Sequence, residues 1–236
     1  MGHTFITCNR CQSNSCFFKQ YSSSVDQDLI ESKKDQTDYL RGEFIHREGD
    51  PILGLYFLQQ GKVKIVTSGL SGSQQIIRLV HYGESLCFRG YGRTTYFAGS
   101  LTLEKSRICF FKSTDFMEIC DISQFSAHLI SYLGNELDIA EKRLQYMMQM
   151  NIREKTAEAL LFIKKSFGVN EKSELDVYLS RKDIASIAGT SEEIIIRQLS
   201  DFEKEKLIER RDHGTRIALI DEQKLRQMIH QFTNSY

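Results

Sequence analysis

Three cysteines near the N-terminus are the residues whose types and spacing best suit chemistry in this sequence. Cys8, Cys11 and Cys16 lie within nine positions. The chain does not begin with a basic segment followed by an apolar run, so we expect no secretory signal and a cytoplasmic protein. In a reducing compartment, cysteines serve as thiols or metal ligands rather than disulfides. A Cys-x2-Cys pair is as typical of zinc as of iron, and a dithiol redox switch is a third possibility.

The composition is that of a globular protein with room for two domains. The 236 residues are 41% hydrophobic and 26% charged, both ordinary values for a globular chain. No stretch approaches the roughly 18 consecutive apolar residues that cross a bilayer, so we expect no membrane partner. The sequence has no G-x-G-x-x-G loop and no βαβ pattern around the cysteine pair. These absences argue against a thiol oxidoreductase, and we expect no enzyme.

Residues 21–121 have the pattern of an all-β domain that follows the cysteine-rich segment 1–20. Residues 21–40 are polar and contain one candidate for a short helix. Beyond them, glycines separate short runs that are rich in β-branched and aromatic residues. Such runs at regular spacing predict a sandwich, barrel or jelly roll. The predicted strands are Glu43–His46, Leu55–Leu58, Lys62–Thr67, Gln75–Val80 and Ser106–Phe111.

A long helix is predicted from about Ile122 to Met150, because the apolar residues there recur at three- and four-residue steps. A narrow stripe on so long a helix favours pairing between two chains, so residues 122–152 are predicted to form a dimerisation helix. The alternative is a helix packed on its own β domain. The predicted dimer contacts are Leu129, Leu133, Leu137, Ala140, Leu144 and Met147.

Residues 153–236 carry the pattern of a winged helix-turn-helix. A capping box from Ser180 to Asp183 predicts a short helix that ends at Gly189. A second capping box from Thr190 to Glu193 predicts a new helix two or three residues later. Two capped helices joined by so short a turn cross steeply, as in helix-turn-helix proteins. The sequence further predicts a strand at Leu175–Leu179 and a hairpin, the wing, from Leu207–Arg210 and Arg216–Ile220.

The outward face of the second helix has residue types that read DNA. Arg197 could reach a guanine edge or a phosphate, Glu193 a cytosine amino group, and Ile196 a thymine methyl group. Residues 151–236 have equal numbers of basic and acidic residues, so DNA binding requires the positive charge to gather on one face. The alternative is a solvated helix beside a charged hairpin. The predicted DNA contacts are Ser180, Arg181, Ser191, Glu192, Glu193, Ile196, Arg197, Arg211 and Arg216.

From about Gly42 to Leu225 the chain resembles the CRP/FNR family of bacterial regulators. The resemblance rests on Gly42-x6-Gly49-Asp50, Leu55-Tyr56-x4-Gly61-Lys62-Val63-Lys64, Gly83-Glu84, Leu179-Ser180-Arg181-x-Asp183-Ile184-Ala185 and Gly189-Thr190-Ser191-x-Glu193-x3-Arg197. It implies an α+β fold with an N-terminal β jelly-roll (cyclic-nucleotide-binding-like) domain, a dimerisation helix and a C-terminal winged helix-turn-helix. It also implies a sequence-specific transcription regulator that acts as a homodimer on double-stranded DNA with RNA polymerase.

The FNR branch of this family holds an oxygen-labile [4Fe-4S] cluster with three N-terminal cysteines and one in the β domain. Cys8-x2-Cys11-x4-Cys16 looks like the N-terminal set, although its x4 gap departs from a commoner x5, and Cys109 falls where the branch has its fourth ligand. The resemblance therefore implies a sensor of oxygen or redox state. Zinc, a thiol switch and idle cysteines remain open.

A cyclic nucleotide is the other ligand that the resemblance to this family implies. Gly83-Glu84 and Arg93-Thr94 loosely match the ribose and phosphate positions, while Gly90-Tyr91-Gly92 and the bulky Tyr96-Phe97 differ from the usual segment. We therefore do not expect a cyclic nucleotide, although a nucleotide-responsive regulator is the alternative.

Overall fold

The structure, a computed structural model, describes residues 5–11, 16–21, 24–69, 74–86, 93–120 and 125–229. The chain divides into two compact units. The first holds Met1–Ser73 and Ile77–Leu137, and the second holds Gln74–Ile76 and Asp138–Tyr236. Within the described ranges, no helix is long and apolar enough to cross a membrane.

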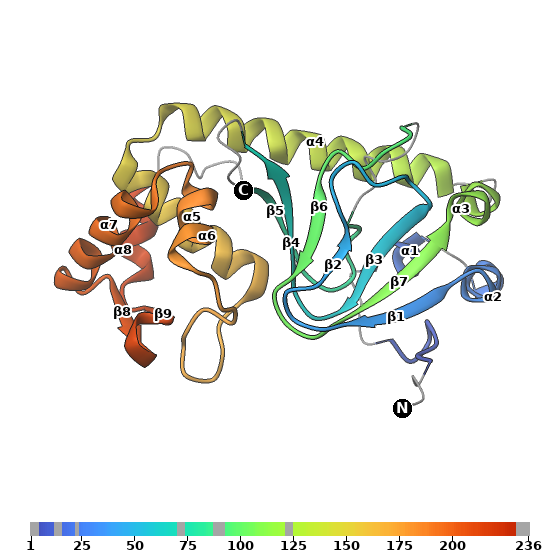
Figure 1. The fold of residues 1–236 in the computed structure, drawn as a ribbon, viewed down its shortest axis with the longest axis horizontal. Coiled ribbons are helices and arrows are strands. Elements are labelled where there is room, and N and C mark those ends of the chain that lie inside the picture. Colours follow the sequence, from blue (N-terminus) through green and yellow to red (C-terminus); the bar gives the residue numbers. More distant parts are fainter. Residues whose placement is uncertain are drawn as a thin grey trace. The chain divides into compact units, whose positions relative to one another are not determined.

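The first unit contains two antiparallel sheets (Figure 1). One has the strand order β1-β7-β3, with β1 at Asp35–Tyr39, β7 at Ser106–Lys112 and β3 at Gly54–Gln60. The other has the order β2-β6-β4-β5, with bounds Phe44–His46, Gly99–Thr102, Val63–Ser68 and Gln74–Val80. All five predicted strands are confirmed, with small changes at their ends. β1 and β6 were not predicted, because four of the five residues of β1 are polar and β6 has a single large apolar residue.

Apolar side chains of β3 and β7 contribute to two separate cores, because successive side chains of a strand point to opposite faces of the sheet. Leu58 and Ile108 belong to the core between the two sheets. Phe57 and Phe111 belong to a second cluster on the other face of the three-stranded sheet. The unit thus buries apolar residues on both faces of that sheet.

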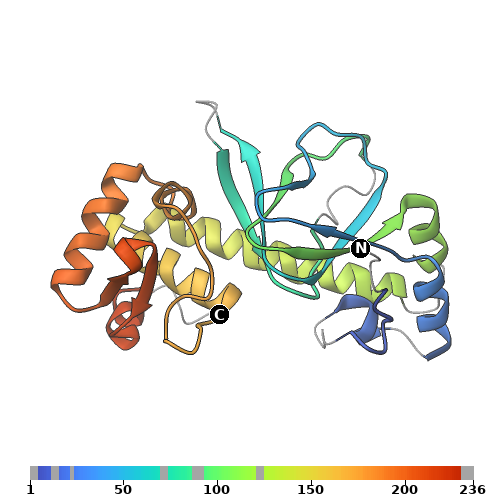
Figure 2. The ribbon, with the colours of Figure 1, turned by 60° about the horizontal axis from the view of Figure 1, so that its bottom comes forward.

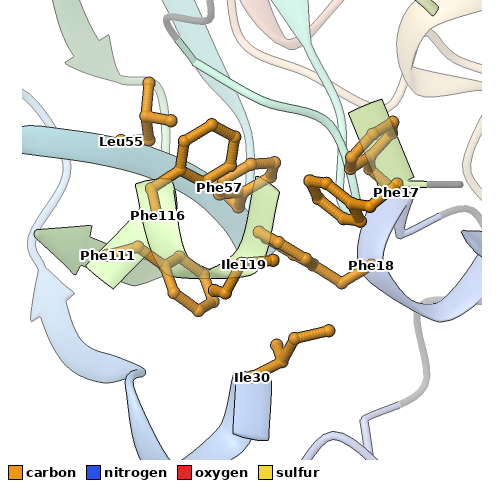
Figure 3. Packing of buried hydrophobic residues seen from close by; sticks show 9 residues of the cluster. Phe17, Phe18, Ile30, Leu55, Phe57, Phe111, Phe116 and Ile119 are labelled. Carbon is orange, nitrogen blue, oxygen red and sulfur yellow. The ribbon is translucent and has the colours of Figure 1, made fainter. Parts of the chain in front are cut away.

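Three short helices cover the outer face of the three-stranded sheet: α1 (Phe17–Tyr21), α2 (Ser24–Ser32) and α3 (Ser113–Cys120). Figure 3 shows the aromatic cluster that they share with β3 and β7. The ring centroid of Phe18 lies 4.6 Å from that of Phe57 and 4.5 Å from that of Phe111. Only one short helix was predicted in this part of the chain, because helices of one or two turns are too short to show a helical period of apolar residues.

Two consecutive helices follow. α4 runs continuously from Phe125 to Gln149, and its predicted start at Ile122 lies outside the described residues. α5 covers Ile152–Phe167 and begins at the N-cap Asn151, whose side chain forms a capping box with Glu154. The capping box satisfies amide groups that a helix end leaves unpaired, so it fixes where one helix stops and the next begins. No prediction from the sequence covered α5.

The second unit contains α5, α6 (Arg181–Ala188), α7 (Glu192–Lys204), α8 (Glu222–Met228) and the hairpin of β8 (Ile208–Arg211) with β9 (Arg216–Leu219) (Figure 2). This order confirms the winged helix-turn-helix. The predicted strand at Leu175–Leu179 is wrong, since its one bridge is the isolated pair of Leu175 with Val169. Buried residues of this segment still alternate with more exposed ones, and this is the pattern from which a strand was predicted.

His46 makes the first unit sensitive to acid. Its ring stacks on Tyr96 with 3.9 Å between centroids, and its Nε2 lies 2.8 Å from the Ser100 hydroxyl oxygen. Burial lowers the pKa of His46 from near 6.5 to about 4. The folded state therefore binds a proton on the His46 ring less tightly than the unfolded chain does. The folded state has its full stability above pH 6.5, where the ring is neutral in both states, and loses stability as the pH falls towards 4.

We therefore expect the free energy of unfolding of the β unit to fall by about 3 kcal/mol across this pH range through His46 alone. Urea denaturation of wild type and His46→Phe at both ends of the range measures it, since phenylalanine keeps a ring but cannot titrate. A decrease of the same size in both proteins would contradict the assignment.

Candidate functional site

Cys109 lies on β7, the central strand of the three-stranded sheet. Its neighbours across the ladder are Gln36 on β1 and Phe57 on β3. It packs against the aromatic cluster on the face that the short helices cover. A central strand has hydrogen-bonded neighbours on both sides, so Cys109 has a fixed position.

Cys16 is fixed by the two residues that follow it. Phe17 and Phe18 begin α1 and are almost completely buried in the aromatic cluster, at 2% and 3% exposure. Cys16 itself packs against this cluster, as Cys109 does. Two buried phenylalanines therefore hold this cysteine against the sheet that carries Cys109.

Cys8 and Cys11 lie on the segment 5–11, which we call the arm. The Gln36 amide pairs with both backbone groups of Ile6: its Nε2 donates to the carbonyl at 2.7 Å and its Oε1 accepts from the amide at 2.9 Å. The Glu31 carboxylate accepts from the Cys8 amide at 3.0 Å. Side chains of α2 and β1 thus attach the arm to the sheet, at the residue that pairs with Cys109.

One small cavity, partly open to solvent, is lined by all four predicted ligands, Cys8, Cys11, Cys16 and Cys109. Lys19 and Lys34 line it too, and no carboxylate of the described residues does. The structure therefore brings the predicted arm cysteines and the strand cysteine together. Cys120 packs against the nearby core without lining the cavity, and Cys87 lies outside the described residues.

Burial makes two of the thiols, those of Cys109 and Cys16, weaker acids than a free cysteine. It raises the pKa of Cys109 to about 12 and also raises that of Cys16. A thiolate is the form that binds metal, so ligation here must displace protons. Among the residues that the structure describes, no three His, Cys, Asp or Glu side chains converge closely enough to hold one metal ion.

The first helix of the helix-turn-helix is capped as predicted, whereas the N-cap of the second helix is a different residue from the predicted one. The Ser180 hydroxyl accepts from the Asp183 amide at 3.1 Å, and Gly189 ends α6 in the left-handed conformation with φ 63°. The second capping box is wrong: the N-cap of α7 is Ser191, whose hydroxyl accepts from the Ile194 amide at 3.4 Å. α7 therefore begins at Glu192, three residues after Gly189 and within the predicted spacing, with Ser191 rather than Thr190 as its N-cap.

The outer face of α7 is open. Ile195, Leu199 and Phe202 are fully buried, while the next position along, Ile196, is 45% exposed. The other predicted base-reading residues of this helix, Glu192, Glu193 and Arg197, are exposed as well. Three charged side chains thus surround one exposed isoleucine.

Two of the three arginines of the wing have carboxylate partners within the chain. Arg210 forms an ion pair with Glu203 at 2.5 Å, and Arg211 forms one with Glu209 at 2.5 Å. Arg181 donates to the Gly214 carbonyl and so links the start of α6 to the wing. Within the described residues, Arg216 has no such partner. The positive charge available to phosphates is therefore smaller than the sequence suggested.

The predicted dimer contacts on α4 fall into two groups. Leu129 and Met147 are half-buried: Leu129 packs against the aromatic cluster and Met147 lies beside Gly189. The other predicted contacts are exposed to solvent, and Ile130 and Met148 extend their stripe at 71% and 79% exposure. The exposed stripe comprises Ile130, Leu133, Leu137, Ala140, Leu144 and Met148.

Glu84, at the position that resembles a ribose site, is held by the chain itself. His81 Nε2 lies 3.1 Å from one carboxylate oxygen, and an Arg78 nitrogen lies 3.7 Å from the other. The same Arg78 nitrogen lies 3.1 Å from the Glu136 carboxylate on α4. Arg78 could not be found from the sequence, because no sequence pattern links β5 to α4. Gly90–Gly92 lie outside the described residues.

Comparison with known proteins agrees with both units. The family model of the cyclic nucleotide-binding domain matches residues 36–123, and that of the Crp-like helix-turn-helix domain matches residues 154–228. Among solved structures, FixK2 from Bradyrhizobium japonicum is similar with a TM-score of 0.71 at 19% identity, covering 83% of this chain and 96% of that one. At this identity the likeness shows the fold alone.

Curated relatives align over most of their length. Electron transport regulator A of Shewanella oneidensis is 26% identical over 227 residues, covering 93% of this chain and 89% of the relative. The fumarate and nitrate reduction regulatory protein of Vibrio cholerae is 23% identical, covering 84% and 86%. The CRP-like cAMP-activated global transcriptional regulator of Mycobacterium tuberculosis is 25% identical, covering 80% and 85%. These relatives are regulators and not enzymes, and this chain belongs to the CRP/FNR family of DNA-binding transcription regulators.

Proposed function

We propose that this regulator senses oxygen or redox state through a [4Fe-4S] cluster held by Cys8, Cys11, Cys16 and Cys109, and that the cluster controls dimerisation and DNA binding. The observation that carries the proposal is the cavity that all four thiols line. Relatives named as an anaerobic regulatory protein and as a regulator of fumarate and nitrate reduction support the same kind of signal.

The donor set suits a thiolate-ligated cluster. Four thiolates are the usual ligands of a cubane, and each binds a different iron, so they stand farther apart than the ligands of one tetrahedral zinc ion. Four thiols that share a cavity without converging on a single ion position favour the larger group. Lys19 and Lys34 supply positive charge next to an anionic assembly.

When bound, such a cluster supplies an iron–sulfur centre that oxygen destroys. The protein's part is to link the arm, which carries Cys8 and Cys11, with the strand that carries Cys109. Ligation by all four would hold the arm on the outer face of the sheet, where Phe17 and Leu129 both pack. Since Leu129 belongs to α4, release of the arm would alter the support of the proposed dimer helix.

The dimer and its partners complete the proposal. Two copies would pair through the exposed apolar stripe of α4, which water otherwise covers. Double-stranded DNA would lie against α7, and RNA polymerase is the further partner. A cyclic nucleotide is not required, because Arg78 and His81 already engage the carboxylate that would meet its ribose.

The metal content of protein purified without oxygen tests the proposal. We expect a brown protein with about four iron and four sulfide per chain, as a cubane requires. Colourless protein with one zinc per chain would replace the cluster with a structural zinc site. Colourless metal-free protein that binds cAMP would replace it with a nucleotide-responsive regulator.

Arg197 is expected to read a base. Replacement by alanine should weaken binding to the selected DNA site by about 1–3 kcal/mol, because a bidentate contact to a base edge is lost. Binding to random duplexes should change little. Arg216→Ala on the wing is the matched control and should weaken both kinds of DNA alike. An equal loss on both DNAs for Arg197→Ala would reassign this residue to phosphate contact.

A further inference from the structure

Lys34 is a buried lysine whose ammonium group, among the described residues, makes its hydrogen bonds and its ring contact with the arm. It lies between α2 and β1 and is 6% exposed. Its Nζ donates to the Ile6 carbonyl at 3.0 Å and to the Cys8 sulfur at 3.2 Å. It also lies 4.8 Å from the centroid of the Phe5 ring. The three contacts come from three of the first four residues of the arm.

Among the described residues, no carboxylate forms an ion pair with the ammonium group of Lys34. A buried ammonium group is costly unless it meets negative charge. The neighbouring Lys33 differs, since it pairs with Asp115 at 3.5 Å and Glu118 at 2.7 Å on α3. Lys19, the other lysine of the cavity, donates to the Cys11 carbonyl at 2.7 Å. An anion that binds this cavity would therefore meet two ammonium groups.

We propose that Lys34 is a positioning residue of the cysteine site: it holds the arm against β1 and donates a charged hydrogen bond to the sulfur of Cys8. The inference rests on the proposed cluster and deepens it. Net charge and hydrogen bonds to the sulfurs set the reduction potential of an iron–sulfur cluster. Lys34 therefore favours the more reduced, more negative state and slows the reaction with oxygen.

The test uses the full chain, reconstituted without oxygen, as wild type, Lys34→Met, Lys34→Arg and Lys33→Met. We expect Lys34→Met to have a lower midpoint potential and to lose its iron–sulfur absorbance in air roughly tenfold faster, as loss of one charge-assisted hydrogen bond implies. Lys34→Arg should restore most of the wild-type behaviour. Lys33→Met removes the same charge one residue away, outside the cavity, and should match wild type.

Trypsin cleavage after Arg10 gives a second readout that needs no metal. Arg10 is exposed on the arm, and metal-free Lys34→Met should be cut there several-fold faster than metal-free Lys33→Met, because the arm loses two hydrogen bonds. An unchanged potential, air stability and cleavage rate in Lys34→Met would overturn the role of Lys34 and leave the cluster proposal intact. If wild type takes up no iron, the cluster proposal fails, and an unchanged cleavage rate then overturns the positioning role.

Discussion

Cys109→Ser is expected to leave the anaerobically purified protein with less than about a tenth of the wild-type iron, because a serine oxygen is a poor substitute for a thiolate at iron. Cys109 is the one predicted ligand on a central strand, so no movement of the arm can replace it. The same variant should bind its DNA site as weakly as air-exposed wild type. Iron analysis and a gel-shift titration on one sample measure both effects.

Cys120→Ser is the matched control for this variant. Cys120 packs against the same aromatic cluster but does not line the cavity, so its serine variant should keep wild-type iron and DNA binding. Circular dichroism should show that both variants are folded, since each buries one small hydroxyl group at a cost of about 1–3 kcal/mol. Full iron content in Cys109→Ser would show that the fourth ligand is another residue.

Leu144→Glu is expected to convert the proposed dimer into a monomer. The Leu144 side chain is 63% exposed in the single chain and lies in the middle of the C-terminal half of the α4 stripe. A carboxylate there would lose its water in the paired state without a partner, and the twofold symmetry would bring a second one beside it. Because the side chain is exposed in the single chain, the chain itself should still fold.

Sedimentation velocity at a fixed protein concentration measures the change. Gln145→Glu is the control, because it adds the same charge at the next, also exposed position of α4, outside the stripe. It should remain dimeric and bind DNA as wild type does. An unchanged sedimentation coefficient for Leu144→Glu would show that the stripe is not the dimer contact.

Local hydrogen bonds explain why the helix-turn-helix could be predicted. The capping box from Ser180 to Asp183 and the left-handed Gly189 act over three or four residues, so sequence spacing is enough to find them. The error at α7 has the same local origin: Thr190 and Ser191 are both good N-caps, and only Ser191 makes the bond.

The contacts that shape the cysteine site could not be predicted, because they join distant segments. Gln36 binds Ile6 across thirty residues, and β1, on which it lies, has no apolar alternation that would predict a strand. The ion pairs of the wing could not be predicted for the same reason. Glu203 lies on α7 and Arg210 on the hairpin, and the two meet only in the folded chain. Cys109 was predicted as a ligand from the family resemblance alone, and in the structure it lines the cavity.

The most direct test measures DNA affinity on one sample before and after exposure to air. Protein purified without oxygen is titrated against its selected DNA site while its iron–sulfur absorbance is recorded, and the titration is repeated as the absorbance decays. We predict that affinity falls in parallel with the absorbance, and that wild type and Cys109→Ser bind equally weakly at the end. An affinity that stays constant while the colour disappears, or a protein that is colourless from the start, would contradict control of DNA binding by a cluster at these four cysteines.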